Sequence, residues 1–482
     1  MKKIILHPFL FAVYPIIFLY SYNAQELLIN QIYLPIIISL LSTLVIWGIM
    51  GLLIKDRIKA GLITTVFLLV FFGYGYTFDL LRVSGVIAVK HRHLLPAFVL
   101  LLGYIIYFIH LSKKNSALEI LSRTLNLMGI VLIIINLINI VSFEVKKMNL
   151  QKQTYTSDNV KTNLNNADNY PDIYFIIMDE YASLDTIKNI WGYDNSWFAD
   201  SLKQKGFYVA EKSTVKYYET TKAIPSYLNM EYVDSKLDMV TCFQKLNNNQ
   251  VSEYLMGMGY EIVAFDNLYA LNPGKGKFTS DYQFDFKEAG AEVKSADDFS
   301  MILINNTMLR AFNYLFKLSY TYNMSRNATL YTLSKLKEIP TEVPDPKFVY
   351  VHLLCPHTPF VFDIKGKEVD PVNNSNWRDK KYYLEQYIYI TKEMEKTIDE
   401  ILKNSKTPPV IILQSDHGPR GNSSPNPSEN IDIPTEEKLK IFNAYYLPNV
   451  NKNILKENVS PINTFRIIFN TYFKDKFELL ED

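Results

Sequence analysis

Three short apolar segments are each followed by residues of types that ligate metals or transfer protons. These residues are Asp179 and Glu180 after 173–178, His352 near the end of 348–354 with His357 shortly after it, and Asp416 and His417 after 410–414. The carboxyl ends of parallel strands meet at one edge of a sheet, so we expect these side chains to lie together. Carboxylate and imidazole ligands suit Zn²⁺ or Mn²⁺, and carboxylates alone suit Mg²⁺ or Ca²⁺. The pattern predicts a divalent-metal site whose ion it leaves open.

The distribution of histidine supports this prediction. Four of the seven histidines lie in or beside apolar N-terminal segments, and the other three all lie at these strand ends: His352, His357 and His417. The alternative is that each is a hydrogen-bonded polar residue at a sheet edge. Three histidines together with two acidic positions at three strand ends favour a common site.

A nucleophile is expected between the first two of these strands. Thr220 and Thr221 precede Pro225, a residue tolerated in the first turn of a helix, so a helix is predicted to begin near Ile224. The threonines would then lie at its N-terminal approach, where free N–H groups and the helix dipole favour an anion. A threonine hydroxyl is an effective nucleophile only when a metal or base activates it. The alternative role is a helix N-cap.

The elements that position these residues follow from the apolar pattern. Segments 173–178, 348–354 and 410–413 are apolar on both faces, as in a parallel sheet covered by helices. Helical periodicity appears at 196–205 and 379–402, a late strand is predicted at 445–447, and a C-terminal helix at 461–473. Alternating strands and helices predict an α/β domain with a doubly wound, largely parallel sheet.

The average composition conceals two unlike parts of the chain. Its 482 residues carry a net charge of +1 and are 48% hydrophobic, which excludes a disordered chain and a strongly basic nucleic-acid-binding protein. Two cysteines exclude a disulfide framework and a zinc site built mainly on Cys. Residues 1–145 hold 11 Lys/Arg and 5 Asp/Glu, whereas the remainder holds 39 and 44. The acidic remainder has no basic stripe, so no nucleic-acid partner is expected.

The first part reads as a membrane anchor. Five stretches are long and apolar enough to cross a bilayer: 5–22, 32–54, 60–76, 94–111 and 120–143. Eight Lys/Arg lie in segments on the same side of the membrane as the N-terminus, and six lie on the opposite side. Because Lys and Arg are more frequent in cytoplasmic loops, this bias favours a cytoplasmic N-terminus. Residues 146–171 are polar and lack an apolar period. The predicted organisation is a transmembrane anchor over 1–145, a linker over 146–171 and an extracytoplasmic catalytic domain over 172–482.

Four segments resemble the alkaline phosphatase/sulfatase superfamily: 171–181, Thr220 with 226–230, 352–360 and 415–420. The chain looks most like the membrane-anchored bacterial branch, which includes lipoteichoic acid synthases and phosphoethanolamine transferases. That branch also carries about five N-terminal helices before an extracytoplasmic catalytic domain. The resemblance covers roughly residues 171–475.

The resemblance implies a role for each matching residue. It implies metal ligation by Asp179, Asp416 and His417, and makes Thr220, in preference to Thr221, both the nucleophile and a ligand. His357 would bind the transferred anion or protonate the leaving group, a role that His352 can share. Arg420 would bind the substrate anion, since a guanidinium matches phosphate geometry. Glu180 would be a further ligand or have no role.

Two motifs found in other branches of the superfamily are missing from this sequence, which narrows the expected nucleophile and the expected number of metal ions. Neither Cys242 nor Cys355 lies in a C-x-P-x-R context, nor does any Ser, which argues against a formylglycine-dependent sulfatase. No Asp-x-x-x-His occurs in the second part, so one divalent metal (Mn, Zn, Mg or Ca) is expected rather than two.

The predicted function is a metal-dependent phosphoester transferase or hydrolase. It would be a multi-pass protein of the bacterial cytoplasmic (inner) membrane, with the lipid bilayer as partner and an anionic phospholipid or envelope glycan as substrate. The alternatives are a sulfatase-like sulfuric or phosphoric ester hydrolase of a soluble substrate, and a catalytically inactive envelope scaffold or sensor.

Overall fold

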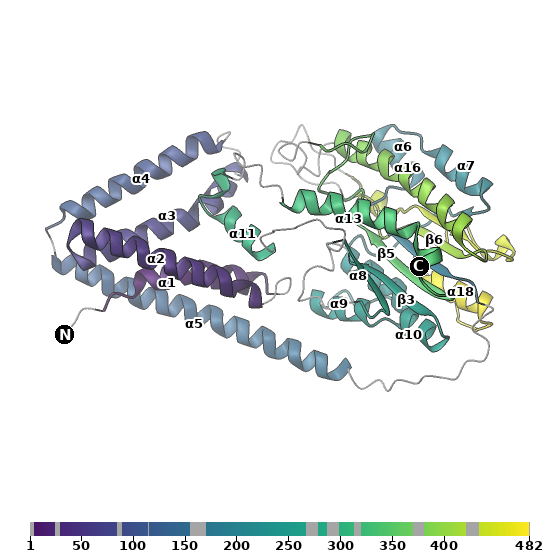
Figure 1. Cartoon of the computed structure of the whole chain (residues 1–482), viewed down its shortest axis with the longest axis horizontal. Helices are drawn as coiled ribbons and strands as arrows, with labels where there is room; N and C mark the ends of the chain where they lie inside the picture. Colours follow the sequence, from purple (N-terminus) through teal and green to yellow (C-terminus); the bar gives the residue numbers. More distant parts are fainter. Residues whose placement is uncertain are drawn as a thin grey trace. The chain divides into compact units, whose positions relative to one another are not determined.

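The computed structural model divides the chain into two compact units (Figure 1). It describes residues 4–24, 29–83, 89–113, 115–154, 170–266, 278–286, 298–312, 320–369, 380–420 and 433–481. The first unit groups Met1–Ser157 with Ser295–Leu318, and the second groups Asp158–Lys294 with Ser319–Asp482.

The first unit is a bundle of apolar helices. They are α1 (His7–Tyr22), α2 (Tyr33–Ile54), α3 (Arg57–Val83), α4 (His91–Leu111) and α5 (Asn115–Thr154), with a 3-10 turn η1 (Ile29–Ile32) before α2. Four stretches are long and apolar enough to cross a membrane: 29–54, 57–81, 91–111 and 116–143. Helix α1 is apolar but has only 16 residues. Four of the five predicted spans are therefore long enough to cross a membrane. The crossing predicted at 5–22, which corresponds to α1, stays a prediction.

Two features of this unit differ from the predicted boundaries. Helix α5 continues to Thr154, so the polar stretch predicted as a linker from residue 146 begins inside a helix. Most of the remaining predicted linker, 155–169, lies outside the described residues. In addition, helix α11 (Asp298–Asn306) groups with the bundle, although its residues lie within the segment predicted as the catalytic domain.

The second unit is built on a seven-stranded sheet of order β2-β7-β6-β1-β5-β3-β4. The strands are β1 (Ile173–Met178), β2 (Tyr208–Val209), β3 (Glu261–Asp266), β4 (Tyr282–Asp285), β5 (Lys347–Leu353), β6 (Val410–Ser415) and β7 (Asn443–Tyr446). Strand β7 is antiparallel to β2 and β6, and all other pairs are parallel. The predicted largely parallel sheet is confirmed, and the four predicted strands correspond to β1, β5, β6 and β7.

Helices cover both faces of this sheet, as the doubly wound prediction requires (Figure 1). Side chains alternate along β1: Tyr174, Ile176 and Met178 join one core, and Ile173, Phe175 and Ile177 join the other. The first core includes α6 (Leu184–Trp191), α7 (Ser196–Gln204), α13 (Tyr320–Leu336), α14 (Ile339–Glu342) and α16 (Lys380–Asn404). The second includes α8 (Thr220–Asn229), α10 (Gln250–Gly257) and α18 (Thr464–Tyr472). Helices α9 (Met239–Asn247) and α17 (Thr435–Leu439) also belong to the described part of this unit.

The helices predicted in this unit are present, with one start misplaced. Helices α7 and α16 match the predicted segments, and α18 follows the turn η7 (Pro461–Asn463). Helix α8 begins at Thr220 rather than near Ile224, and Pro225 is its sixth residue. A proline inside a helix removes one internal hydrogen bond. The prediction was wrong because it read Pro225 as a first-turn residue.

Candidate metal-dependent active site

The register of the central strands brings the predicted site residues to one edge of the sheet. Strand β1 lies between β5 and β6, and Met178 pairs with both Leu353 and Ser415. The residues that follow β1 and β6, Asp179 and Asp416, therefore leave the sheet side by side. His352 is the last residue but one of β5 and pairs with Ile177.

Asp179 is a fully buried carboxylate that lacks hydrogen-bond donors in the described part of the chain. His352 Nε2 lies 3.4 Å from its Oδ2, and His417 Nε2 lies 4.0 Å from its Oδ1. Burial by itself raises the pKa of Asp179, but the imidazoles of His357, His352 and His417 outweigh it and hold the pKa below its usual value. A buried, ionised carboxylate without donors fits a bound cation.

Asp416 and His417 complete a three-residue group that suits a divalent metal. One ligand atom from each of Asp179, Asp416 and His417 lies within 4.8 Å of the others. His417 Nδ1 is 2.7 Å from the Gly418 carbonyl oxygen, which can only accept, so this nitrogen carries the proton. His417 Nε2 faces the group, 3.3 Å from Asp416 Oδ2 and 3.2 Å from Arg420 Nη2. Two carboxylates and one imidazole are a donor set typical of Zn²⁺ or Mn²⁺.

Thr220 is the first residue of α8 and meets this group directly. Its hydroxyl donates to Asp416 Oδ2 at 2.7 Å and lies 3.2 Å from His417 Nε2. Arg420 approaches the same hydroxyl, with its Nη2 3.5 Å from Thr220 Oγ1. The side chain is 3% exposed. The Thr220 hydroxyl therefore lies between the three-residue group and the Arg420 guanidinium. All of them meet at the N-terminus of a helix, where an anion is favoured.

Glu180 pairs with Arg420 rather than with the three-residue group. Its Oε1 lies 3.0 Å from Arg420 Nε, and its backbone N–H donates to Asp416 Oδ1 at 3.1 Å. Burial raises the pKa of Glu180 well above its usual range; Arg420 opposes this, and the charges of Asp179 and Asp416 add to it. Its φ of 59° is in the left-handed region, which a non-glycine residue rarely adopts. The turn after β1 thus holds a strained residue at the site.

His357 joins the site through its backbone. Its N–H donates to the Asp179 carbonyl at 3.2 Å, and its Nδ1 lies 2.6 Å from the Thr358 carbonyl oxygen. Nδ1 therefore carries the proton, and burial lowers the pKa of the ring.

Three further residues that position the site were missed at the sequence level. Tyr227 donates its hydroxyl to the Asp416 carbonyl at 2.8 Å, and Tyr383 donates to the Glu180 carbonyl at 2.7 Å. Gln386 is fully buried and bonds to four backbone groups around His357. Spacing offered a signal for two of them. Tyr227 lies two helical turns after Thr220, and Gln386 is a polar residue on the apolar face of α16.

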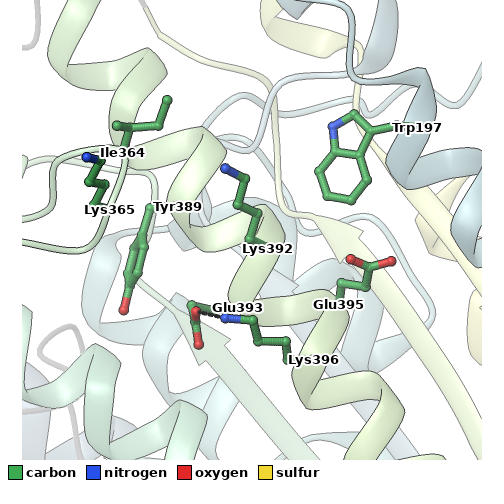
Figure 2. Close-up of a pocket in the computed structure, with 8 residues that line it drawn as sticks. All are labelled: Trp197, Ile364, Lys365, Tyr389, Lys392, Glu393, Glu395 and Lys396. Atoms are coloured by element: carbon green, nitrogen blue, oxygen red, sulfur yellow. Dashed lines mark hydrogen bonds and ion pairs between the residues drawn. The ribbon is translucent and has the colours of Figure 1, made fainter.

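A groove elsewhere on this unit contains none of these residues. It has a volume of about 540 Å³ and lies along α7, α16 and the loop between β5 and α16 (Figure 2). Its lining residues are Trp197, Ile364, Lys365, Tyr389, Lys392, Glu393, Glu395 and Lys396. Figure 2 shows the Glu393–Lys396 ion pair, which spans 2.7 Å. The candidate chemistry lies with the buried group at the strand ends, not in this groove.

No protein-family model matches the chain, and no curated protein matches it. Among solved structures, it is similar to the C-terminal periplasmic domain of phosphoethanolamine transferase EptC from Campylobacter jejuni (14% identity, TM-score 0.40). That match covers 64% of this chain and 92% of the other. It is also similar to the integral membrane protein lipooligosaccharide phosphoethanolamine transferase A from Neisseria meningitidis (11% identity, TM-score 0.44), over 97% of this chain and 95% of the other.

A third similar structure is the lipoteichoic acid synthase LtaP from Listeria monocytogenes. It is 14% identical with a TM-score of 0.40, over 67% of this chain and 77% of the other. These names belong to the branch that the motifs resemble.

Proposed function

We propose that this chain is a membrane-anchored, metal-dependent phosphoester transferase or hydrolase with Thr220 as its nucleophile. The observation that carries the proposal is the Thr220 hydroxyl at the start of α8, 2.7 Å from Asp416 Oδ2 and beside the Asp179–Asp416–His417 group. Asp179, Asp416 and His417 would hold one divalent cation. When bound, such a cation lowers the pKa of a coordinated hydroxyl and stabilises charge on phosphate oxygens.

In the first step Thr220 Oγ1 attacks phosphorus. The Thr220 O–P bond forms, the bond from phosphorus to the leaving oxygen breaks, and the hydroxyl proton passes to Asp416 Oδ2, which already accepts it. The N–H groups at the start of α8 and the Arg420 guanidinium bind the phosphate oxygens. A phosphate anion beside His357 favours the protonated ring, so His357 can bind the anion or donate a proton to the leaving oxygen.

In the second step water or a second alcohol attacks the phosphothreonine. The new O–P bond forms as the attacking hydroxyl gives its proton to His357, which lost one to the leaving oxygen in the first step. The Thr220 O–P bond breaks, and Thr220 Oγ1 takes back its proton from Asp416 Oδ2. Water makes the protein a hydrolase, and an alcohol makes it a transferase. The apolar bundle favours transfer on a lipid-linked or envelope substrate, because anchoring raises the effective concentration of a membrane-borne reactant. We place the α/β unit on the extracytoplasmic side of a bacterial inner membrane.

Mass spectrometry of the Thr220 peptide tests this proposal. The full-length protein is incubated with Mn²⁺ or Zn²⁺ and vesicles of bacterial membrane lipids, and then digested. A covalent adduct on Thr220 is expected in the wild type and in the matched control Thr221→Ala. Thr220→Ala should carry no adduct and should show no turnover of a p-nitrophenyl phosphodiester. An active Thr220→Ala protein would refute the assignment.

The same assay separates the alternatives. Hydrolysis of the soluble phosphodiester without transfer to any lipid would support a hydrolase of soluble substrate. Cleavage of p-nitrophenyl sulfate would support a sulfatase-like hydrolase. A purified protein that binds no divalent metal and turns over none of these substrates would support an inactive scaffold.

A further inference from the structure

Residues 298–312 lie in the middle of the α/β unit's sequence, yet they pack within the helical bundle. The chain passes from the second unit to the first before Ser295 and returns after Leu318. We propose that residues 298–312, the docking segment, attach the α/β unit to the membrane bundle independently of the connection that follows α5. This proposal does not depend on the chemistry proposed above.

The first support is an apolar anchor inside the bundle. Phe299 is fully buried in a cluster with Ile16, Ile17 and Tyr20 of α1 and with Ile140 of α5. Leu303, one helical turn later, packs against the same cluster. An aromatic side chain buried between two bundle helices resists removal, because its exposure to water is unfavourable.

The second support is a close approach between two backbones. The Met308 N–H donates to the Phe71 carbonyl of α3 at 2.9 Å. At Gly75, one turn further along α3, an added Cβ would lie 2.2 Å from the Asn305 carbonyl oxygen and 2.6 Å from Asn306 Cα. Both atoms belong to the backbone, so a side chain at Gly75 forces the docking segment away from α3.

The third support is the Arg310 side chain, which contacts the C-terminal end of α3. Arg310 Nη1 lies 2.7 Å from Asp79 Oδ2 and 3.3 Å from the Gly75 carbonyl oxygen. The guanidinium carbon also lies 4.9 Å from the centroid of the Phe78 ring. An arginine that meets a carboxylate, a carbonyl and an aromatic face on one helix is specific for that helix.

The C-terminal part of the docking segment exposes two large apolar side chains. Leu309 is 45% exposed and Phe312 is 39% exposed, on either side of the Arg310 contacts. Helices α2 and α4 of the same bundle expose large apolar side chains such as Leu52 and Leu100. Outward apolar residues on a bundle of spanning length suit contact with lipid. The segment therefore fits a partner made of the bundle and its surrounding bilayer.

A cleavage experiment on the full chain tests the attachment. A specific protease site is inserted between residues 158 and 165, the protein carries an N-terminal affinity tag, and cleavage is done in detergent micelles. The fragment that begins after the site is expected to be captured with the tagged bundle in 1 M salt. Release of the wild-type fragment on cleavage would overturn the proposal.

Two glycines of α3 provide matched variants. Gly75→Ala is expected to reduce capture of the fragment about tenfold or more, because the added methyl group meets backbone atoms. Gly73→Ala should capture like the wild type, since no atom lies within 4 Å of its added Cβ. Equal capture in both variants would overturn the proposal, because the fragment would then be held elsewhere.

A charge exchange between Asp79 and Arg310 tests the same attachment in variants that keep Gly75. Asp79→Arg alone should weaken capture, and Asp79→Arg combined with Arg310→Asp should restore it. Capture that is insensitive to Asp79→Arg, or that the double exchange fails to restore, would show that this ion pair does not hold the docking segment.

Discussion

Gln386 connects helix α16 to the loop that carries His357, and its replacement should reduce both stability and activity. The side chain is fully buried. Its Oε1 accepts from the backbone N–H groups of Val361 at 2.7 Å and Phe362 at 3.3 Å. Its Nε2 donates to the carbonyl oxygens of Pro356 at 3.2 Å and His357 at 3.0 Å. One amide therefore satisfies four backbone groups within the loop 356–362 that carries His357.

The change Gln386→Leu leaves these four backbone groups without their partner. Each buried polar group that loses its partner costs about 1–3 kcal/mol, and the two longer bonds contribute least. Because the two shorter bonds dominate, at about 1–3 kcal/mol each, the free energy of unfolding should fall by about 2–6 kcal/mol. The α/β unit spans 158–294 and 319–482. At about 2.1 cal/mol/K per residue, a unit of about 300 residues should lose roughly 3–10 °C in unfolding temperature.

Gln414→Leu is the matched control. Gln414 is also fully buried and lies on β6, two residues before Asp416, but neither of its amide atoms has a hydrogen-bond partner in the described structure. Replacing it with an apolar side chain leaves no group newly unpaired. The unfolding temperature should stay within about 2 °C of the wild type or rise.

Intrinsic tryptophan fluorescence provides the assay, because Trp191 stacks on Tyr383, one turn before Gln386 on α16, at 4.5 Å between ring centroids. Thermal unfolding of the full chain is followed in detergent, and phosphodiester turnover is measured at 25 °C, where both variants are folded. Gln386→Leu should lower kcat more than it changes KM, because the His357 loop also contacts Asp179. An unfolding temperature and a kcat equal to those of Gln414→Leu would refute the reasoning.

Three other perturbations have defined outcomes. Lys347 is fully buried, with Nζ 2.6 Å from Asp172 Oδ2. Lys347→Met should lower the free energy of unfolding, measured with denaturant, by about 3–5 kcal/mol. Adding Asp172→Asn should recover most of that loss. A double variant as unstable as Lys347→Met would contradict this. Arg420→Ala should lower kcat/KM roughly 10–100-fold through the loss of a charged contact with phosphate, and Arg420→Lys should lower it less; unchanged steady-state kinetics would count against a role in anion binding. After chelation, Zn²⁺ or Mn²⁺ at about 100 times Kd should raise the free energy of unfolding by about 2.7 kcal/mol, and His417→Ala should remove this response; a variant stabilised like the wild type would exclude His417 as a ligand.

Local patterns in the sequence were enough to predict the strands and the residues that leave them. Segment 173–178 is apolar at every position, and the structure shows it as β1, buried on both faces. A run of that kind is stable only inside a covered sheet, so Asp179 had to lie at its edge. The same holds for Asp416 and His417 after β6. Apolar length likewise predicted helices of membrane-spanning length in the first part of the chain.

Only the tertiary structure decided which side chains meet across long stretches of chain. Thr220 and Asp416 are 196 residues apart, and their contact depends on the start of α8, which Pro225 led the sequence reading to misplace. Glu180 follows a metal-ligand type in the sequence, yet it pairs with Arg420. The Gln386 contacts and the docking of residues 298–312 have no local pattern that specifies their partners. Periodicity reports which face of an element is buried, but the partner on that face is set by packing between distant elements.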